Sequence, residues 1–248
     1  STYNGTPWSC VACDQYTSQP DYWESADATA SDSPSTLRLI IPEVYLAETD
    51  ARKPRVLSAM DDYLKHVLVE HPHTMILVER TLRSGETRWG LVGAVDLLTY
   101  DYRKGADSLI RATEATVAER IPARTTIRRD APVELPHVMM LIDDRQKTVI
   151  EPLAVVKDTL APAYDHDLMQ NSGHLKGYFL NPALMEQVES ALAALITPEA
   201  RSPPSRSVPV TERAFRRCCL PWVTATTLWP PLRPALRRCA PPSVTRPP

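Results

Sequence analysis

The chain has 248 residues, 43% of them hydrophobic, which is enough for one packed core or two small ones. Its formal net charge of −2 hides an uneven distribution, because residues 1–200 carry 29 of the 30 acids and only 19 of the 28 bases. Such an acidic surface argues against nucleic-acid or anionic-membrane binding, and no apolar run is long enough to span a membrane. Since the sequence also starts without a signal-peptide pattern, we expect a cytoplasmic protein.

Strands and helices are predicted along the first part of the chain. Residues 24–36 are rich in Asp, Ser and Ala and predict a loop, and the apolar run 37–41 predicts a strand. Apolar residues spaced three and four apart over 55–68 predict a helix. The β-branched and apolar segments 74–82 and 88–98 are separated by a short turn, which predicts a hairpin.

Further along, residues 138–143 and 148–156 predict two strands, and 182–195 predict a helix. These elements indicate an α/β or α+β domain over residues 1–200, with a mixed sheet and packed helices. The pattern shows neither an internal repeat nor a doubly wound arrangement. We expect this domain to be incomplete at its C-terminal end, because of the composition of residues 201–248.

Residues 201–248 contain 11 Pro and 9 Arg, lack Gly and Lys, and have Glu212 as their only acid. This composition is typical of a GC-rich gene translated in a shifted frame, and it cannot form a packed core. When each codon is started at the third base of the previous one, Cys218–Cys219 must give Leu, Trp222–Val223 must give Gly and Trp229–Pro230 must give Ala. One permitted reading is an apolar strand, a Gly-Asp-Gly-Asn-His turn and an Ala-rich helix start. We therefore interpret this segment as an out-of-frame, disordered tail, and expect the chain as written to be inactive.

Cys10 and Cys13 form a Cys-x-x-Cys pair, which is compatible with a redox couple or with half of a zinc site. A second half-site is missing, and the flanking Val11 and Ala12 are typical of a buried strand. Two small thiols in the core are the favoured interpretation.

Three stretches of the sequence carry a family resemblance: 8–23, 108–122 and 134–144. Together with the reframed Gly-Asp-Gly-Asn-His turn, they resemble the bacterial and archaeal domain-of-unknown-function family 1015, in the branch typical of anaerobic Firmicutes. The resemblance covers residues 8–200 continuously and resumes only after reframing. Because this family has no settled activity, the resemblance implies a fold but no reaction.

The densest group of polar residues lies between positions 111 and 124. Arginine can hold a phosphate or carboxylate with two hydrogen bonds, glutamate can transfer a proton, and threonine can donate to an anion. The charge pattern alone favours a solvated helix with ion pairs. The resemblance implies a site role for Arg111, Glu114 and Thr116, although the histidine of the family's grouping is absent; Arg120 is a further ligand-binding candidate.

Residues 172–178 predict a loop with two glycines that allow close approach of a ligand to the backbone. In this loop Lys176 could neutralise a phosphate and His174 could act as an acid or base, although a simple exposed turn is an equal alternative. Asp14 and Gln15 end an apolar run in a way that resembles the family's N-terminal signature.

Asp143 and Asp144 could together bind Mg²⁺, but adjacent aspartates are also common in turns, and a turn is the favoured interpretation. No metal site is therefore predicted, and the residues identify no cofactor.

The leading hypothesis is an enzyme that acts on a phosphorylated or nucleotide ligand. The reframed turn is similar to a motif of the ParB and sulfiredoxin-like superfamily, some members of which bind nucleotide or phosphorylate free serine, and this similarity is an analogy. The alternative is a non-enzymatic protein that senses a small molecule or binds a partner. The candidate catalytic residues are Glu114 and His174, and the candidate ligand-binding residues are Asp14, Gln15, Arg111, Thr116, Arg120 and Lys176.

Overall fold

The computed structural model describes residues 5–11, 16, 18–95, 100–101, 103, 110–111, 118, 121–133, 138–195 and 222–225. Within this part of the chain, no helix is both long enough and apolar enough to cross a membrane.

The described strands form a large mixed sheet and a separate pair. The large sheet contains β1 (Ile76–Thr81), β2 (Thr87–Gly93), β5 (Val138–Leu141), β6 (Ala161–Asp167), β7 (His174–Phe179) and β8 (Trp222–Ala225), in the order β5-β8-β2-β1-β7-β6. β8 runs parallel to β2, and the other neighbouring strands of this sheet are antiparallel. β3 (Tyr100–Asp101) and β4 (Ile110–Arg111) pair in parallel. The prediction of an α+β domain with a mixed sheet is thereby confirmed.

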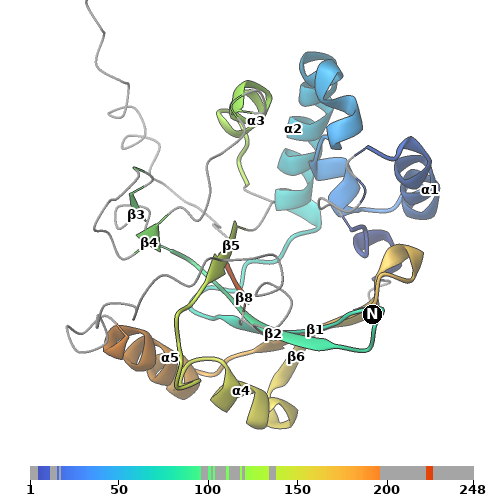
Figure 1. Ribbon diagram of the computed structural model, residues 1–248. Coiled ribbons are helices and arrows are strands. Elements are labelled where there is room, and N and C mark those ends of the chain that lie inside the picture. Colours follow the sequence, from blue (N-terminus) through green and yellow to red (C-terminus); the bar gives the residue numbers. More distant parts are fainter. Residues whose placement is uncertain are drawn as a thin grey trace, which may run out of the picture.

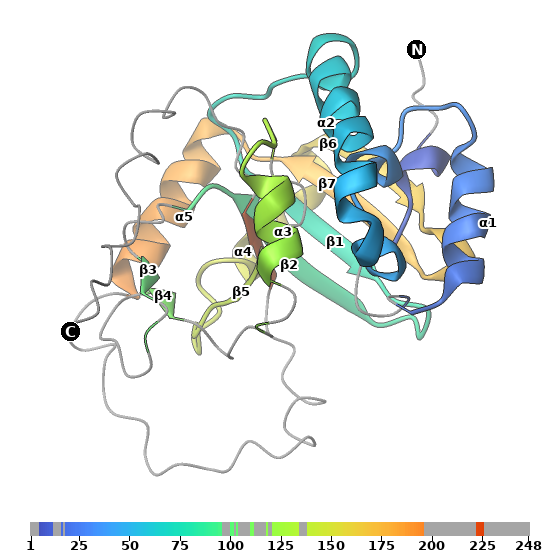
Figure 2. The same ribbon diagram turned by 90° about the horizontal axis from the view of Figure 1, so that it is seen from above.

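Helices cover the sheet from two sides. The α-helices are α1 (Pro20–Ala30), α2 (Thr49–His66), α3 (Ile121–Arg128), α4 (Glu151–Val155) and α5 (Pro182–Ala194), and the 3₁₀ helices are η1 (Thr6–Trp8), η2 (Thr36–Leu39), η3 (Glu43–Glu48), η6 (Lys157–Thr159) and η7 (Met169–Asn171). Figure 1 shows α1, α2 and α3 on one side of the sheet and α4 and α5 on the other. Seen from above in Figure 2, α2 lies over the part of the sheet that contains β7 and β1, and α3 lies over β2.

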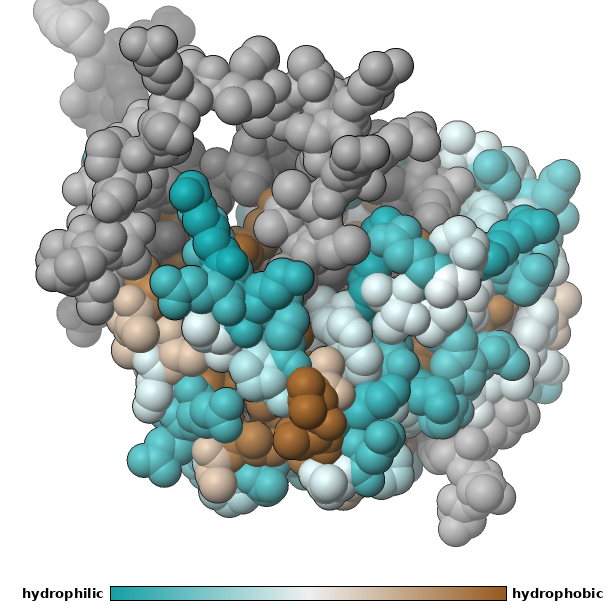
Figure 3. Space-filling view, turned by 60° about the horizontal axis from the view of Figure 1, so that its bottom comes forward, coloured by the Kyte–Doolittle hydropathy of each residue, from teal (hydrophilic) through white to brown (hydrophobic). Residues whose placement is uncertain are grey.

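The core on the α4 and α5 side is made by apolar side chains from the central strands and both helices. Leu77 of β1 and Leu91 of β2 pack against Leu153 of α4 and Val188 of α5, and all four are at most 2% exposed. Burial of one such side chain contributes about 1.5–3 kcal/mol. Figure 3 looks onto this side and shows one compact hydrophobic area among hydrophilic side chains.

On the opposite side of the sheet, two further clusters hold α1 and α2. One consists of Val56, Met60 and Tyr63 of α2 with Leu39 and Val133. The other joins α1 to the turn after β6, and its buried members are Val11, Tyr22, Trp23, Ala26, Ala30, Leu37, Leu168 and Met169. These clusters fix the N-terminal segment beside the end of β6.

Several predicted elements are confirmed. The helix expected at 55–68 is the larger part of α2, which contains Pro54 within its first two turns. The hairpin expected from 74–82 and 88–98 is formed by β1 and β2, although its strands are shorter. The strand at 138–143 is β5, and the helix at 182–195 is α5, whose start is capped by the Asn181 side chain.

Other elements were predicted wrongly. The loop expected at 24–36 largely forms α1, because Pro20 starts the helix and apolar residues recur on one buried face. The strand expected at 37–41 is replaced by η2, where the Ser35 hydroxyl accepts a hydrogen bond from the Leu37 amide at 3.1 Å. The segment 148–156 contains α4, because Val149, Ile150 and Leu153 all pack beneath the sheet.

Four residues of the proline- and arginine-rich segment take part in the sheet. Trp222–Ala225 forms β8, which pairs with Gly90–Gly93 of β2 and Val138–Leu141 of β5. The Trp-Val-Thr-Ala sequence contains two β-branched residues and an aromatic one, which favours a strand. The interpretation of the whole segment 201–248 as an out-of-frame, disordered tail stays a prediction.

Candidate functional site

The antiparallel pair of β6 and β7 places four ionisable side chains together. Side chains alternate between the two faces of a strand, so Asp165 and Asp167 of β6 share one face. The register sets Asp165 opposite Lys176 and Asp167 opposite His174. Two acids therefore face two bases across neighbouring strands, and we call these residues the β6–β7 cluster.

Hydrogen bonds connect all four members of this cluster. The His174 imidazole has its Nε2 atom 2.6 Å from Oδ1 of Asp165 and its Nδ1 atom 2.7 Å from Oδ1 of Asp167. Lys176 Nζ lies 3.1 Å from Oδ2 of Asp165. Both imidazole nitrogens face carboxylates, an arrangement that favours the doubly protonated ring, in which both nitrogens donate.

These contacts shift the ionisation of the cluster. The hydrogen bond to Asp167, assisted by the one to Asp165, raises the pKa of His174 above its ordinary value despite partial desolvation. Desolvation raises the pKa of the Asp165 carboxyl, but the hydrogen bonds from Lys176 and His174 outweigh it and hold that pKa below its ordinary value. The positive charge of His174 and the negative charge of Asp165 therefore stabilise each other.

Gly173 and Gly177, on either side of His174, are required by close contacts within the protein. Gly173 has φ of +103°, and a Cβ atom there would lie 2.1 Å from the backbone oxygen of Thr81. A Cβ on Gly177 would lie 2.4 Å from the ring of Tyr164. The prediction of a loop at 172–178 is wrong, because most of it forms β7. Close approach does occur at both glycines, but to the chain's own backbone and to a tyrosine ring.

A second polar group continues the cluster along the same face. Glu79 of β1 lies opposite Lys176 in the register, and its carboxylate accepts a hydrogen bond from the Tyr178 hydroxyl at 2.8 Å. Lys157 Nζ donates to the two oxygens of Glu79 at 3.1 and 3.0 Å and lies 5.2 Å from the ring centre of Trp89. Burial, together with the Glu79 carboxylate, raises the pKa of Tyr178 to about 12, so Tyr178 stays a neutral donor.

A cavity of about 350 Å³ lies at the end of β6, on the side of the sheet that carries α1, and Asp167 is the one member of the cluster in its lining. It is bounded by η1, by the face of α1 that carries Tyr22, Ser25, Ala26 and Thr29, and by residues 166–170. Its volume lies within the range of sites that hold small molecules, roughly 300–1,000 Å³. Asp167 belongs both to the lining of this cavity and to the cluster.

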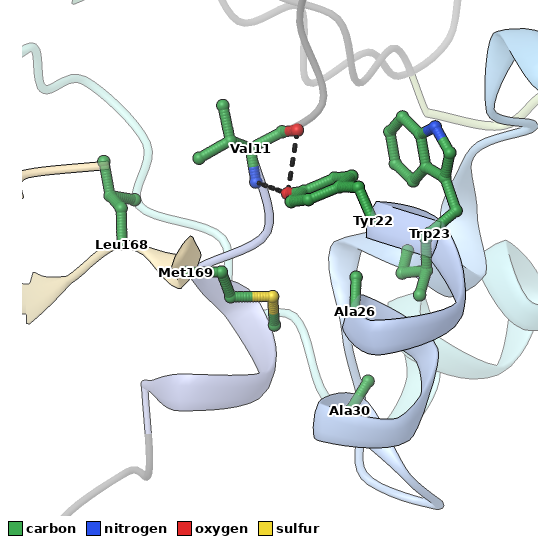
Figure 4. Close-up of a cluster of buried hydrophobic side chains, with 8 residues drawn as sticks. Val11, Tyr22, Trp23, Ala26, Ala30, Leu168 and Met169 are labelled. Atoms are coloured by element: carbon green, nitrogen blue, oxygen red, sulfur yellow. Dashed lines mark hydrogen bonds between the residues drawn. The ribbon is translucent and has the colours of Figure 1, made fainter. Parts of the chain in front are cut away.

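One wall of the cavity is rigidly built. In Figure 4 the Tyr22 hydroxyl reaches the backbone of Val11, accepting from its amide at 2.7 Å and donating to its carbonyl at 3.0 Å. Burial raises the pKa of this hydroxyl, so it remains protonated and able to donate. Ala26, Leu168 and Met169 pack around it and close the wall.

Of the eight predicted site residues, His174 and Lys176 have described side chains, and the structure brings them together at Asp165. Arg111 lies in β4, away from the large sheet in Figure 1, and only its backbone is described. The other five lie outside the described residues: Asp14, Gln15, Glu114, Thr116 and Arg120. Their roles stay predictions.

The aspartates after β5 serve a turn. The Asp144 carboxylate accepts hydrogen bonds from the backbone amides of Thr148 at 2.6 Å and Val149 at 2.8 Å, and Asp143 pairs with Arg145 at 3.5 Å. Among the described residues, no group of three or more His, Cys, Asp or Glu side chains is arranged to hold a metal ion.

The sequence analysis missed Asp165 and Asp167. Their signal is an Asp-x-Asp pair followed, after a glycine-containing turn, by His174-x-Lys176. Complementary charges at alternate positions on both sides of a turn are typical of neighbouring antiparallel strands. Pro162 and the polar composition of 161–167 hid β6, because Pro is rare inside strands.

Comparison with known proteins identifies a family but no characterised relative. The family described as "Protein of unknown function (DUF1015)" matches residues 2–198. No curated protein and no solved structure matches the chain.

Proposed function

Since the chain belongs to the DUF1015 family of proteins of unknown function, we propose its function from its own residues. In its restored reading frame, the protein is an enzyme that binds a phosphate-bearing small molecule at the β6–β7 cluster. The ligand is a nucleotide or another phosphorylated metabolite. The observation that carries this proposal is the position of Asp167, which hydrogen-bonds His174 and also lines the cavity of about 350 Å³.

Asp165 and His174 supply the acid–base chemistry in this proposal. A carboxylate that holds one imidazole nitrogen orients the ring and stabilises its protonated form, which leaves the other nitrogen to exchange a proton with a substrate. Asp165 is 54% exposed and is also held by Lys176, so it is the firmer partner. Asp167 is 91% exposed, so water competes for it and it is the partner that can leave.

An anionic ligand can then replace the Asp167 carboxylate. A phosphate oxygen at that position would accept a hydrogen bond from His174 Nδ1, and the ammonium group of Lys176 on the same face would supply a second positive charge. The hydroxyls of Thr6, Ser25 and Thr29 around the cavity suit a ligand that carries hydroxyl groups. Glu114 as a second catalytic residue, and Asp14, Gln15, Arg111, Thr116 and Arg120 as ligand contacts, remain part of the proposal.

A non-enzymatic binding protein is the second candidate. It is favoured by the internal pairing of the cluster, since Asp165 pairs with both His174 and Lys176 without a ligand. In this second candidate the cluster has a structural role, holding β6 against β7, and the cavity binds a regulatory molecule. Turnover distinguishes the two candidates.

The test uses the frame-restored protein with a panel of nucleotides and phosphorylated metabolites. Binding is measured by calorimetry, and phosphate transfer or release is measured by ³¹P NMR. We expect Asp167→Asn to tighten binding because it removes the competing anion, and His174→Gln to abolish turnover while binding persists. Asp143→Asn, a change of the same type at an exposed turn, serves as the control. Unchanged binding in Asp167→Asn would contradict the site, and binding without turnover would select the non-enzymatic alternative.

A further inference from the structure

A second cavity, of about 100 Å³, lies between α1 and α2 and has a different chemistry. Three arginines reach it, Arg38 from η2 and Arg52 and Arg55 from α2. Asp27 is the only acid in its lining. This excess of positive charge contrasts with the first 200 residues as a whole, in which acids outnumber bases by 29 to 19.

The guanidinium groups of Arg38 and Arg52 are held in place by the protein. Arg38 donates to the Asp27 carboxylate and to the Ser31 carbonyl, and its side chain is 19% exposed. Arg52 lies 3.8 Å from the ring centre of Tyr45, and its Nε donates to Glu48 at 2.7 Å. Fixing such long side chains in advance reduces the entropy that is lost when a ligand binds.

Arg55 completes the group. It lies three residues after Arg52 on α2, a spacing that places both side chains on the same side of the helix. Within the described part of the chain, neither Arg55 nor the terminal nitrogens of Arg52 have a hydrogen-bond acceptor in the protein. These donors are therefore available to an external acceptor at the cavity.

We propose that this cavity is a binding site for a small oxyanion, a phosphate or phosphoryl group, held by Arg52 and Arg55 with Arg38 as a third positive charge. Guanidinium groups match phosphate with paired hydrogen bonds. The cavity of about 100 Å³ is well below the size that encloses a whole metabolite, roughly 300 Å³ or more, so it suits the anionic group alone. With Asp27 and the Glu48 carboxylate that pairs with Arg52 both counted, the three arginines still leave a net positive charge at the cavity, which favours an anion.

This site is separate from the one proposed at the β6–β7 cluster. The face of α1 that carries Trp23 and Asp27 lines the arginine cavity, whereas Tyr22, Ser25, Ala26 and Thr29 line the other one. The two cavities share no residue, so a variant in one leaves the composition of the other unchanged.

The test is a titration of the full 248-residue chain with inorganic phosphate at constant ionic strength, followed by calorimetry and by NMR of the arginine side chains. We expect saturable binding that weakens about tenfold or more in Arg55→Gln and in Arg52→Gln, because each loses a charged hydrogen bond. Arg83→Gln, at an exposed arginine in the β1–β2 turn, serves as the control and should bind as the unsubstituted chain does. Acetate at the same ionic strength should bind more weakly than phosphate.

Arg55 is exposed, so its replacement should leave the fold intact, and circular dichroism checks this. Arg55→Lys provides a second variant that keeps the charge but loses the paired geometry, and it should bind with intermediate strength. Absence of saturable phosphate binding would overturn the proposal, as would equal affinity in Arg52→Gln, Arg55→Gln and Arg83→Gln. Tighter binding in Asp167→Asn, together with unchanged affinity in Arg52→Gln and Arg55→Gln, would assign the phosphate to the β6–β7 cluster instead.

Discussion

The Nε2 atom of His174 lies 2.6 Å from Oδ1 of Asp165, although the register places these residues diagonally rather than directly opposite each other. The imidazole thus bridges two positions of β6, since its other nitrogen contacts Asp167. A single side chain therefore ties the ends of β6 and β7 together. Because His174 can lose its charge, the strength of these two hydrogen bonds should depend on pH.

The first prediction concerns the ionisation of His174. Because the hydrogen bond to Asp167 is the main cause of its raised pKa, Asp167→Asn should lower that pKa towards the ordinary value of 6.5. A ¹H–¹⁵N NMR titration of the imidazole measures the shift. Asp143→Asn should leave it unchanged, and an equal effect of both replacements would show that net charge alone sets the pKa.

The second prediction concerns stability against pH. His174 has a raised folded pKa, so its contribution is complete below the unfolded value of 6.5 and is lost as pH rises through the folded value. Asp165 has a lowered folded pKa, so its contribution is present above 3.8 and is lost as pH falls through the folded value. The difference in unfolding free energy between the parent chain and His174→Gln should therefore be largest from about pH 4 to 6.5. Urea denaturation across this range tests it, and a difference that grows above pH 8 would contradict it.

The third prediction concerns the pair formed by Glu79 and Lys157. Their side chains are 15% and 28% exposed, so Glu79→Gln leaves a largely shielded ammonium group without its carboxylate. We expect a loss of about 1–3 kcal/mol in unfolding free energy. A double-mutant cycle with Lys157→Met isolates the pair, and effects that add within about 0.3 kcal/mol would show that the two residues do not interact.

The fourth prediction compares two glycines with positive φ. Gly85, at +83°, has open space around it, whereas Gly173, at +103°, faces the Thr81 oxygen. Gly85→Ala should cost about 1–2 kcal/mol from backbone strain alone. Gly173→Ala should cost clearly more, because a backbone atom must also move. Urea denaturation gives the loss of unfolding free energy for each variant, and the difference between the two losses measures the Thr81 contact without the backbone strain that both variants share. Equal losses would mean that the Thr81 contact is relieved without cost.

The fifth prediction concerns the reading frame. A single-base correction near codon 201 should restore ligand binding and raise stability, because the Gly-Asp-Gly-Asn-His turn and the elements around it would complete the domain. Thermal unfolding and the nucleotide panel, applied to both proteins, measure the two effects. Equal stability and equal ligand response would show that residues 201–248 are genuine sequence.

Strong periodicity made α2 and α5 predictable, and a clear turn between apolar segments made the β1–β2 hairpin predictable. The failures have specific causes. The run 37–41 is apolar enough for a strand, but the Ser35 hydroxyl and burial of Leu37 and Leu39 favour a 3₁₀ turn. In 148–156 the same β-branched residues fit a short helix once the sheet above offers a surface to pack against. Tertiary packing decided both cases.

The candidate site was predictable only in part. His174 and Lys176 stood out because they carry charge between glycines, but their partners lie in a strand that the sequence concealed. The arginine cavity could not be foreseen, because Arg38 and Arg52 are brought together by the packing of η2 on α2. Side chains from separate segments meet only after the fold is formed, and a single sequence carries little signal for such meetings.

The position of strand β8 in the sheet affects whether molecules of this protein associate with one another. β8 lies between β2 and β5, and in the described part of the chain it is the only strand that joins β5 to the sheet. If Trp222–Ala225 separates from the sheet, Gly90–Gly93 presents its unpaired amides and carbonyls as an open edge. Such an edge can accept a strand from another molecule. The pairing or release of β8 would then decide whether the molecules remain separate or associate through the edges of their sheets.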